Sequence, residues 1–179
     1  LVESGVDIQH VIVDPSVKTG LGIALCQDND RAILTYLGSL NAIYPEQISD
    51  DLLHSARHLH HGSYFLQTNL RPAIPGIFAR ARSFGLSTSL DTNWDPEERW
   101  NNTLQQSLQV TDVFLPNEQE ARYISRASNL DDAIRVFQGM GVAITAVKRG
   151  EEGAQVVSKG ERHICELPAT TGGDSIGTG

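Results

Sequence analysis

Residues 113–120, Val-Phe-Leu-Pro-Asn-Glu-Gln-Glu, decide the fold, because a strand passes directly into a helix within this stretch. Residues 113–115 are apolar and suit a short buried strand. Asn117 is a favoured N-cap residue, and two glutamates stand in the first turn after it, where the helix dipole favours negative charge. The stretch therefore predicts a strand followed by a helix that runs to Ile124.

The same alternation of strand and helix continues on both sides. Apolar runs predict strands over 86–91 and 141–147, and another around 60–66. Apolar residues at helical spacing predict helices from Pro45, over 72–84, from Asp95-Pro96, and from Asn129 or Asp131 to 138. Such alternation is typical of βαβ units. The sequence therefore predicts an α/β protein with a doubly wound, mostly parallel sheet and helices on both faces.

Residues 1–40 have a different rhythm. Apolar, β-prone runs lie at 11–13, 22–26 and 32–37, and a polar cluster at 27–30 suits a hairpin turn. Strands with tight connections pair antiparallel. We therefore expect a small antiparallel β segment over 1–40 and an α/β core over 41–179, with a further hairpin made by 154–158 and 162–167.

Composition excludes some classes of function. The chain has 179 residues, a net charge of −8 and a pI near 5.1, so a basic nucleic-acid surface is not expected. No apolar run is long enough to span a membrane. Cys26 and Cys165 stand in apolar, alternating strands, which suggests reduced core thiols and a cytoplasmic protein. The first residue is Leu1 rather than methionine, so we interpret the chain as part of a longer protein.

Polar residues follow the predicted strands, and in open α/β sheets ligands bind beyond the carboxyl ends of strands. Asp-Thr-Asn follows at 91–93, Asn-Glu-Gln-Glu at 117–120, and Lys-Arg-Gly-Glu-Glu-Gly at 148–153. Each also has a purely structural interpretation: a helix cap for Asn117, a hairpin for the glycines. The last residues, Asp-Ser-Ile-Gly-Thr-Gly at 174–179, could cradle an anion with backbone N–H groups or form a flexible tail.

Taken in order, these motifs resemble the ribokinase-like (PfkB) family of ATP-dependent carbohydrate kinases. Residues 91–94 are similar to the family's Asp-x-Asn strand end, and 117–120 to its Asn-x-x-Glu motif. Residues 147–154 resemble its nucleotide-contacting Val-x-x-Gly-x-x-Gly-Ala segment, and 174–179 resemble its Asp-Thr-x-Gly-Ala-Gly-Asp signature. The resemblance covers essentially the whole chain. It implies a ribokinase-like fold in which 1–40 form a lid, and a central portion that lacks both ends.

The resemblance also implies residue roles. It assigns nucleotide contacts to Asn117, Lys148, Arg149, Gly150 and Gly153, and a water-mediated Mg²⁺ role to Glu120. The backbone N–H groups of Gly177, Thr178 and Gly179 would form an anion hole for the transferring phosphoryl group, with the aspartate base expected directly after Gly179. Asp174 and Ile176 match positions that bind a monovalent cation, such as K⁺, in many but not all members.

Substrate contacts are implied at Asn93, Gln67 and Arg31. Asp95 stands where members with acidic substrates carry an arginine, which favours a neutral sugar or nucleoside, whereas Arg31 argues for an anionic one. We expect ATP-dependent phosphorylation of a hydroxyl of a small sugar or sugar-like substrate, and a homodimer formed through the lid. The alternative is a non-catalytic sugar- or nucleotide-binding regulator. We expect no turnover from the 179-residue polypeptide alone.

Overall fold

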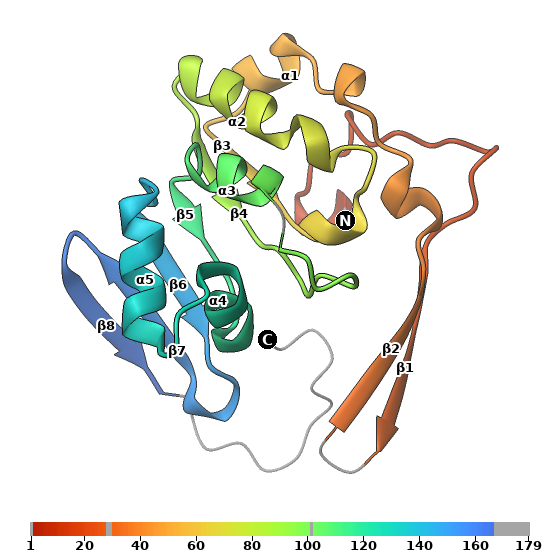
Figure 1. Cartoon of the computed structure of the whole chain (residues 1–179). Coiled ribbons are helices and arrows are strands. Elements are labelled where there is room, and N and C mark those ends of the chain that lie inside the picture. Colours follow the sequence, from red (N-terminus) through yellow and green to blue (C-terminus); the bar gives the residue numbers. More distant parts are fainter. Residues whose placement is uncertain (1, 28–29, 101, 167–179) are drawn as a thin grey trace.

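The computed structural model describes residues 2–27, 30–100 and 102–166, which form two sheets (Figure 1). The larger sheet has six strands in the order β3-β4-β5-β6-β7-β8. Their bounds are His58–His61, Ser87–Leu90, Val113–Phe114, Ile144–Lys148, Ala154–Ser158 and Glu161–Cys165. β3 to β6 pair in parallel, and β7 and β8 are added as an antiparallel hairpin. The expected α/β protein with a mostly parallel sheet is confirmed.

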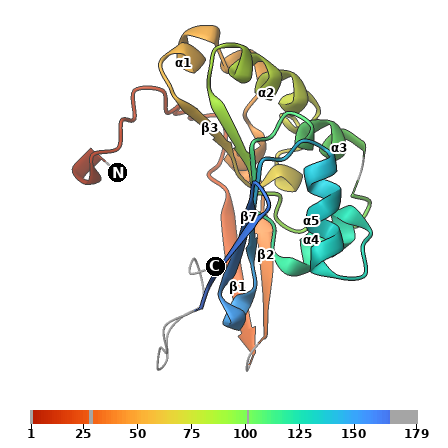
Figure 2. The same cartoon turned by 90° about the vertical axis from the view of Figure 1, so that its left-hand side faces the viewer.

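Helices connect the parallel strands. α1 (Asp50–His54) precedes β3, α2 (Ile74–Ser83) leads to β4, α3 (Asn102–Leu108) leads to β5, and α4 (Glu118–Ser125) with α5 (Leu130–Gly139) leads to β6. The strands follow one another in sequence order and such crossovers are right-handed. As a result α2 to α5 lie on the same side of the sheet (Figure 2). Within the described ranges, no helix is long and apolar enough to cross a membrane.

The main core lies between this layer of helices and the sheet. Phe78 of α2, Leu90 of β4, Phe114 of β5, Phe137 of α5 and Val147 of β6 are all fully buried in it. The rings of Phe114 and Phe137 meet edge to face, with centroids 4.9 Å apart. Close packing on one face fixes the sheet and therefore fixes where each strand ends.

The smaller sheet is the hairpin of β1 (Leu21–Gln27) and β2 (Asp30–Tyr36), paired antiparallel. It projects away from the six-stranded sheet (Figure 1). One of its faces is apolar, because Leu21, Ile23 and Leu25 stand opposite Tyr36, Leu34 and Ala32. The expected antiparallel sheet in the first part of the chain is confirmed.

The strand expected at 11–13 is wrong. The backbone there makes a turn in which the Val11 N–H donates to the Ile8 carbonyl at 2.9 Å, and Val13 is 87% exposed. A β-prone run becomes a strand only beside a partner, and within the described residues none pairs with it. The expectation that Cys165 is a core thiol is also wrong, because Cys165 is exposed on β8.

The helix expected from Pro45 is interrupted. Pro45–Gln47 is a single 3₁₀ turn, and α1 starts afresh because the Ser49 hydroxyl accepts from the Leu52 N–H at 3.2 Å. Leu59 lies in β3, and the strand predicted around 60–66 ends at His61, after which the chain forms a 3₁₀ segment at Tyr64–Leu66. The other 3₁₀ turns are Val2–Ser4, Gly38–Asn41, Arg71–Ala73 and Gly150–Glu152.

Candidate active site

Three strand ends meet at the carboxyl edge of the parallel sheet. β5 ends at Phe114, level with Leu90 at the end of β4, whereas β6 continues past Thr145, the partner of Phe114, to Lys148. Because β5 lies between β4 and β6, Lys148 reaches across the chain that leaves β5, and its Nζ lies 2.7 Å from Oδ2 of Asp91, which follows β4. The Lys148 N–H donates to the Pro116 carbonyl at 2.9 Å, which places Asn117 beside Lys148. Residues from all three strand ends therefore converge at one place.

Asn117 and Glu120 form a reciprocal cap at the start of α4. The Asn117 Oδ1 accepts from the Glu120 N–H at 2.8 Å, and the Glu120 Oε2 accepts from the Asn117 N–H at 2.8 Å. The structural interpretation of both residues is therefore confirmed. It does not use up either side chain, because the Asn117 amide N–H₂ and the second Glu120 oxygen take no part in it.

Glu120 is 3% exposed, and this burial raises the pKa of its carboxyl. The hydrogen bond from the Asn117 N–H and the Lys148 ammonium oppose the rise, while the Asp91 carboxylate adds to it. The described residues contain no group of three or more His, Cys, Asp or Glu that could hold a metal directly. One buried, half-engaged carboxyl fits a water-mediated contact to Mg²⁺ better than direct ligation.

The segment after β6 curls into a tight turn. The Arg149 N–H donates to the Gly153 carbonyl at 2.8 Å, and both Gly150 and Gly153 have positive φ, at 58° and 82°. A Cβ on Gly153 would lie 2.0 Å from the Cys165 carbonyl oxygen, so only glycine fits there. The Arg149 guanidinium pairs with Glu118 at 3.1 Å and also with Glu152. This turn therefore places the positively charged Arg149 guanidinium beside the start of α4.

The segment after β4 carries Asn93, whose φ is 56° and whose N–H lies 3.3 Å from the Asp91 Oδ1. The neighbouring segment after β3 is tied to it, since the Tyr64 N–H donates to the Asp91 carbonyl at 3.4 Å. Gln67 lies on that segment and donates through Nε2 to the Gly62 carbonyl at 2.9 Å. Asn93 and Gln67 therefore belong to adjacent, connected loops at the carboxyl edge.

Asp95 does not cap the third helix as expected, because α3 begins only at Asn102. Its carboxylate is 2% exposed and accepts hydrogen bonds from the N–H groups of Glu97, Arg99 and Trp100. The helix start predicted at Asp95-Pro96 is therefore wrong, although the Asp95 carboxylate does receive backbone N–H groups. The donors belong to a turn instead of a helix.

His61 was not expected to have an unusual environment. It ends β3, is 7% exposed, and its Nε2 is buried without a hydrogen-bond partner among the described residues. Burial, with a smaller effect of neighbouring His60, lowers the pKa of His61 to about 4. Nothing in the sequence pattern could have shown this, since the burial of His61 depends on the tertiary fold around the end of β3.

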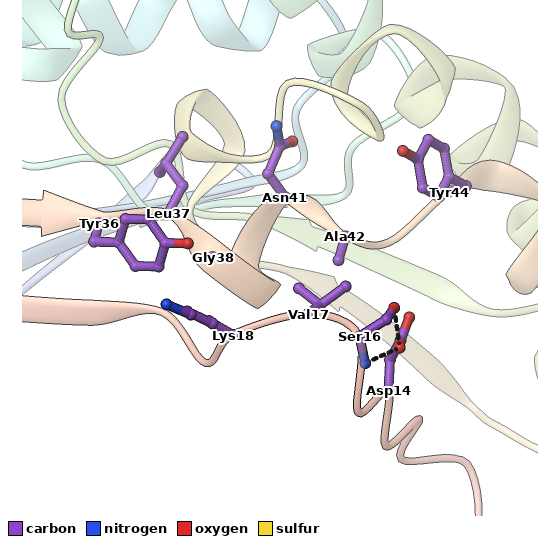
Figure 3. Close-up of a pocket in the computed structure, with 10 residues that line it drawn as sticks. All are labelled: Asp14, Ser16, Val17, Lys18, Tyr36, Leu37, Gly38, Asn41, Ala42 and Tyr44. Carbon is purple, nitrogen blue, oxygen red and sulfur yellow. Dashed lines mark hydrogen bonds between the residues drawn. The ribbon is translucent and has the colours of Figure 1, made fainter.

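Two cavities flank the expected substrate side. One, of about 220 Å³, lies at the end of β3 and is lined by Leu59, His60, His61, Gly62 and Gln67, together with Ile43, Ile48, Leu70, Ile74, Ile77 and Phe78. The other, of about 770 Å³, lies at the root of the hairpin and is lined by Asp14, Ser16, Val17, Lys18, Tyr36, Leu37, Gly38, Asn41, Ala42 and Tyr44 (Figure 3).

The larger cavity is polar on one side. The Ser16 N–H and hydroxyl both donate to the Asp14 Oδ1, at 2.8 and 2.6 Å, as Figure 3 shows, and these bonds lower the pKa of Asp14. Its wall includes Gly38, where an added Cβ would lie 2.5 Å from the Lys18 carbonyl oxygen. The two backbone segments that meet at the root of the hairpin, around Lys18 and Gly38, therefore pass each other at contact distance.

The remaining expected site residues lie wholly or partly outside the described part of the chain. Gly177, Thr178, Gly179, Asp174 and Ile176 lie outside the described residues. Arg31 lies on β2, but its side chain is also outside the description. Asp91 begins the motif at 91–94, and the sequence predicts no separate role for it. Its ion pair spans 57 positions of sequence, and only the folded sheet brings the partners together.

Relatives of this chain are kinases. A cytidine kinase of Thermococcus kodakarensis is 31% identical over 84 residues, 42% of this chain and 30% of that protein. An ATP-dependent ribose-1-phosphate kinase of Halopiger xanaduensis is 29% identical over 160 residues, 87% of this chain and 49% of that protein. The chain thus spans half or less of the length of these two relatives.

The solved structure of fructokinase from Vibrio cholerae O395, with fructose, ADP and calcium ion bound, superposes with a TM-score of 0.78. It is 17% identical, and the match covers 99% of this chain and 60% of that one. At this identity the likeness establishes the fold alone. The profile of one family matches the whole of residues 1–179. The chain belongs to the pfkB family of carbohydrate kinases.

Proposed function

We propose that the protein containing this chain transfers the γ-phosphoryl group of ATP to a hydroxyl of a small sugar or sugar-like substrate. The observation that carries the proposal is the convergence of Asp91, Lys148, Asn117 and Glu120 at the carboxyl edge of the sheet. Phosphoryl transfer needs positioning and charge stabilisation more than covalent chemistry by the protein. A buried carboxyl, an ammonium and a helix N-terminus in one place supply both.

The nucleotide side of the site would consist of Asn117, Lys148 and the turn from Arg149 to Gly153. The Lys148 ammonium and the Arg149 guanidinium carry the positive charge that phosphates require, and each is held by a carboxylate. Glu120 would order a water on Mg²⁺, whose charge would neutralise the phosphates. The backbone of Gly177, Thr178 and Gly179 would receive the transferring group, and Asp174 and Ile176 would bind a monovalent cation such as K⁺.

The acceptor side would be formed by Asn93 and Gln67, with Arg31 on the hairpin as a further contact. The named relatives differ in substrate charge: one acts on cytidine and one on ribose 1-phosphate. We favour a neutral acceptor for this chain, because Asp95 brings no positive charge to the loop after β4 and is itself buried.

We further propose that the hairpin, acting as a lid, forms a homodimer contact. Leu21, Ile23, Leu34 and Tyr36 are 58%, 49%, 58% and 55% exposed, and they share one face. Contiguous exposed apolar surface of this kind marks an interaction site. The two-fold symmetry that is commonest in oligomers places the same patch on both partners.

The test is ADP formation by the longer polypeptide that contains this chain, with ATP, Mg²⁺ and a panel of sugars and nucleosides. Asn117→Ala and Asn129→Ala are a matched pair, because Asn129 caps α5 by the same bond, from the Asp132 N–H at 2.9 Å. Each variant should lose about 1 kcal/mol of stability. Only Asn117→Ala should also weaken ATP use, by about tenfold or more.

No ADP formation with any acceptor would overturn the proposal. ATP binding without turnover would indicate the non-catalytic regulator instead. If Asn129→Ala lowered kcat/KM for ATP as much as Asn117→Ala does, the effect would reflect helix stability, and the assignment of Asn117 to the nucleotide would fail.

A further inference from the structure

Residues 91–100, which join β4 to α3, form a loop that we call the acceptor loop, because it carries Asn93. Its backbone is unusual: Asn93, Glu98 and Trp100 have φ of 56°, 51° and 45°. Left-handed backbone is uncommon for residues other than glycine, and it is sterically unfavourable for a bulky residue such as Trp100. Such conformations persist where the surroundings over-determine them. Something must therefore hold this loop.

Asp95 holds it from inside. The Asp95 Oδ1 accepts from the Glu97 N–H at 3.0 Å, and its Oδ2 accepts from the N–H groups of Arg99 and Trp100, each at 2.9 Å. Its backbone carbonyl accepts from the Glu98 N–H at 3.0 Å. All four consecutive amides of 97–100 thus point at one residue. Bonds from amides to an ionised carboxylate are stronger than those to a neutral acceptor.

Trp100, whose backbone N–H is bonded to Asp95, also belongs to a cluster of aromatic rings. Trp100 is 9% exposed. Its ring lies edge to face with those of Phe65 and Trp94, at centroid distances of 5.3 and 5.2 Å. It stacks on Tyr123 of α4 at 5.8 Å. Trp94 is the neighbour of Asn93 in sequence, so the cluster transmits the position of Trp100 to the residue beside Asn93.

The other end of the loop is held independently. The Asp91 N–H donates to the His61 carbonyl at 3.0 Å, and the Asp91 carboxylate pairs with Lys148. The Phe65 N–H donates to the Thr92 carbonyl at 3.3 Å. Asn93 therefore sits between two fixed points, one set by Asp91 and the other by Asp95.

We propose that Asp95 is a positioning residue, which holds the acceptor loop so that Asn93 faces the phosphoryl acceptor. The proposal rests on the function proposed above. It assigns Asp95 no contact with substrate, because its carboxylate is 2% exposed and fully engaged by backbone amides. Its role is to fix geometry, and small displacements of a substrate-binding group reduce catalysis strongly.

The test compares Asp95→Asn with Glu97→Gln in the longer polypeptide. Asparagine keeps the shape of aspartate but turns a donor N–H₂ toward amides that themselves donate. Glu97 is a matched control in the same loop, since its side chain is 60% exposed and, among the described residues, pairs only with Arg99, at 3.7 Å. Asp95→Ser, a shorter acceptor, serves as the second variant if Asp95→Asn does not fold.

Two readouts separate the outcomes. The amide proton resonances of Arg99 and Trp100 should move in Asp95→Asn and stay unchanged in Glu97→Gln, whether or not the protein is active. With acceptor varied, kcat/KM should fall about 10- to 100-fold in Asp95→Asn while KM for ATP changes by less than about twofold.

Unmoved amide resonances would overturn the proposal, and so would equal losses for acceptor and ATP, which a purely structural role would produce. Wild-type protein that forms no ADP would defeat the proposed function and with it the positioning role. In that case, amide resonances of Arg99 and Trp100 that move in Asp95→Asn would still establish that Asp95 fixes the conformation of the acceptor loop.

Discussion

The six-stranded sheet and the β1–β2 hairpin both carry apolar strand residues, yet these residues lie in opposite environments. Leu90, Phe114 and Val147 of the large sheet are fully buried. Ile23 and Leu34 of the hairpin are about half exposed, at 49% and 58%. The difference comes from what lies on each sheet: α2 to α5 cover one face of the first, while the apolar face of the hairpin stays open. Apolar alternation thus identifies a strand without revealing whether it is covered.

The largest expected effect on stability comes from truncating a side chain in the core between the large sheet and its helices. Phe137→Ala would remove the ring that packs on Phe114 and leave a cavity, so the free energy of unfolding should fall by about 3–5 kcal/mol. Urea denaturation followed by circular dichroism measures it. The matched change in the hairpin is Tyr36→Ala, at 55% exposure, which should change stability by no more than about 0.5 kcal/mol. Similar losses in the two variants would contradict the contrast between the sheets.

A smaller effect should follow from protonating His61, which is buried at the end of β3. The pKa of His61 is lowered from 6.5 to about 4, so between those values the unfolded chain binds a proton that the folded chain does not. Unfolding therefore becomes easier as pH falls through this window, by about 3 kcal/mol in total. The raised pKa of Glu120 acts in the opposite direction, because the folded state then holds its proton longer as pH rises.

The comparison of wild type with His61→Gln isolates the histidine, since Glu120 is common to both. The difference in unfolding free energy between the two proteins should change steadily between pH 6.5 and about 4. His163→Gln is the control, because His163 is 71% exposed on β8. A parallel pair of pH profiles for wild type and His61→Gln would show that His61 titrates normally.

The smallest effect on stability, and the one that sharpens the comparison most, concerns the open face of the hairpin. Ile23→Thr keeps a β-branched residue, so the free energy of unfolding should change by less than about 0.5 kcal/mol. Self-association, measured by sedimentation, should nevertheless weaken if this face contacts a second copy. Thr35→Ala, on the opposite face of the same hairpin, should leave association unchanged. Equal association of all three proteins would remove the hairpin from the interface.

The sequence predicted local features of the site well and long-range ones poorly. The cap made by Asn117 and Glu120 spans three positions, and both its residue types and its spacing are visible in the sequence. The pair of Lys148 and Asp91 joins residues 57 positions apart that only the strand order of the folded sheet brings together, and no local pattern gives that order. The predicted strand at 11–13 failed for a related reason, because strand formation requires a partner that propensity does not supply.

Asp95 shows a third kind of outcome. Its sequence context is a sound helix-start signal, and its carboxylate does receive backbone N–H groups. The helix begins only at Asn102, after the amides of 97–100 have turned inward around the carboxylate. Local chemistry was predictable, whereas the path of the backbone depended on the packing of Trp100 against Phe65 and Tyr123.

The order of the strands in the large sheet bears on how the chain folds. Each strand from β4 to β8 pairs with the strand that precedes it in the sequence, so no strand must be inserted between two that already pair. The sheet can therefore grow from one side as the polypeptide leaves the ribosome, each new strand closing only the loop that separates it from the last. Such growth avoids pairing between strands at opposite ends of the sequence, and it favours domain-wise folding during synthesis.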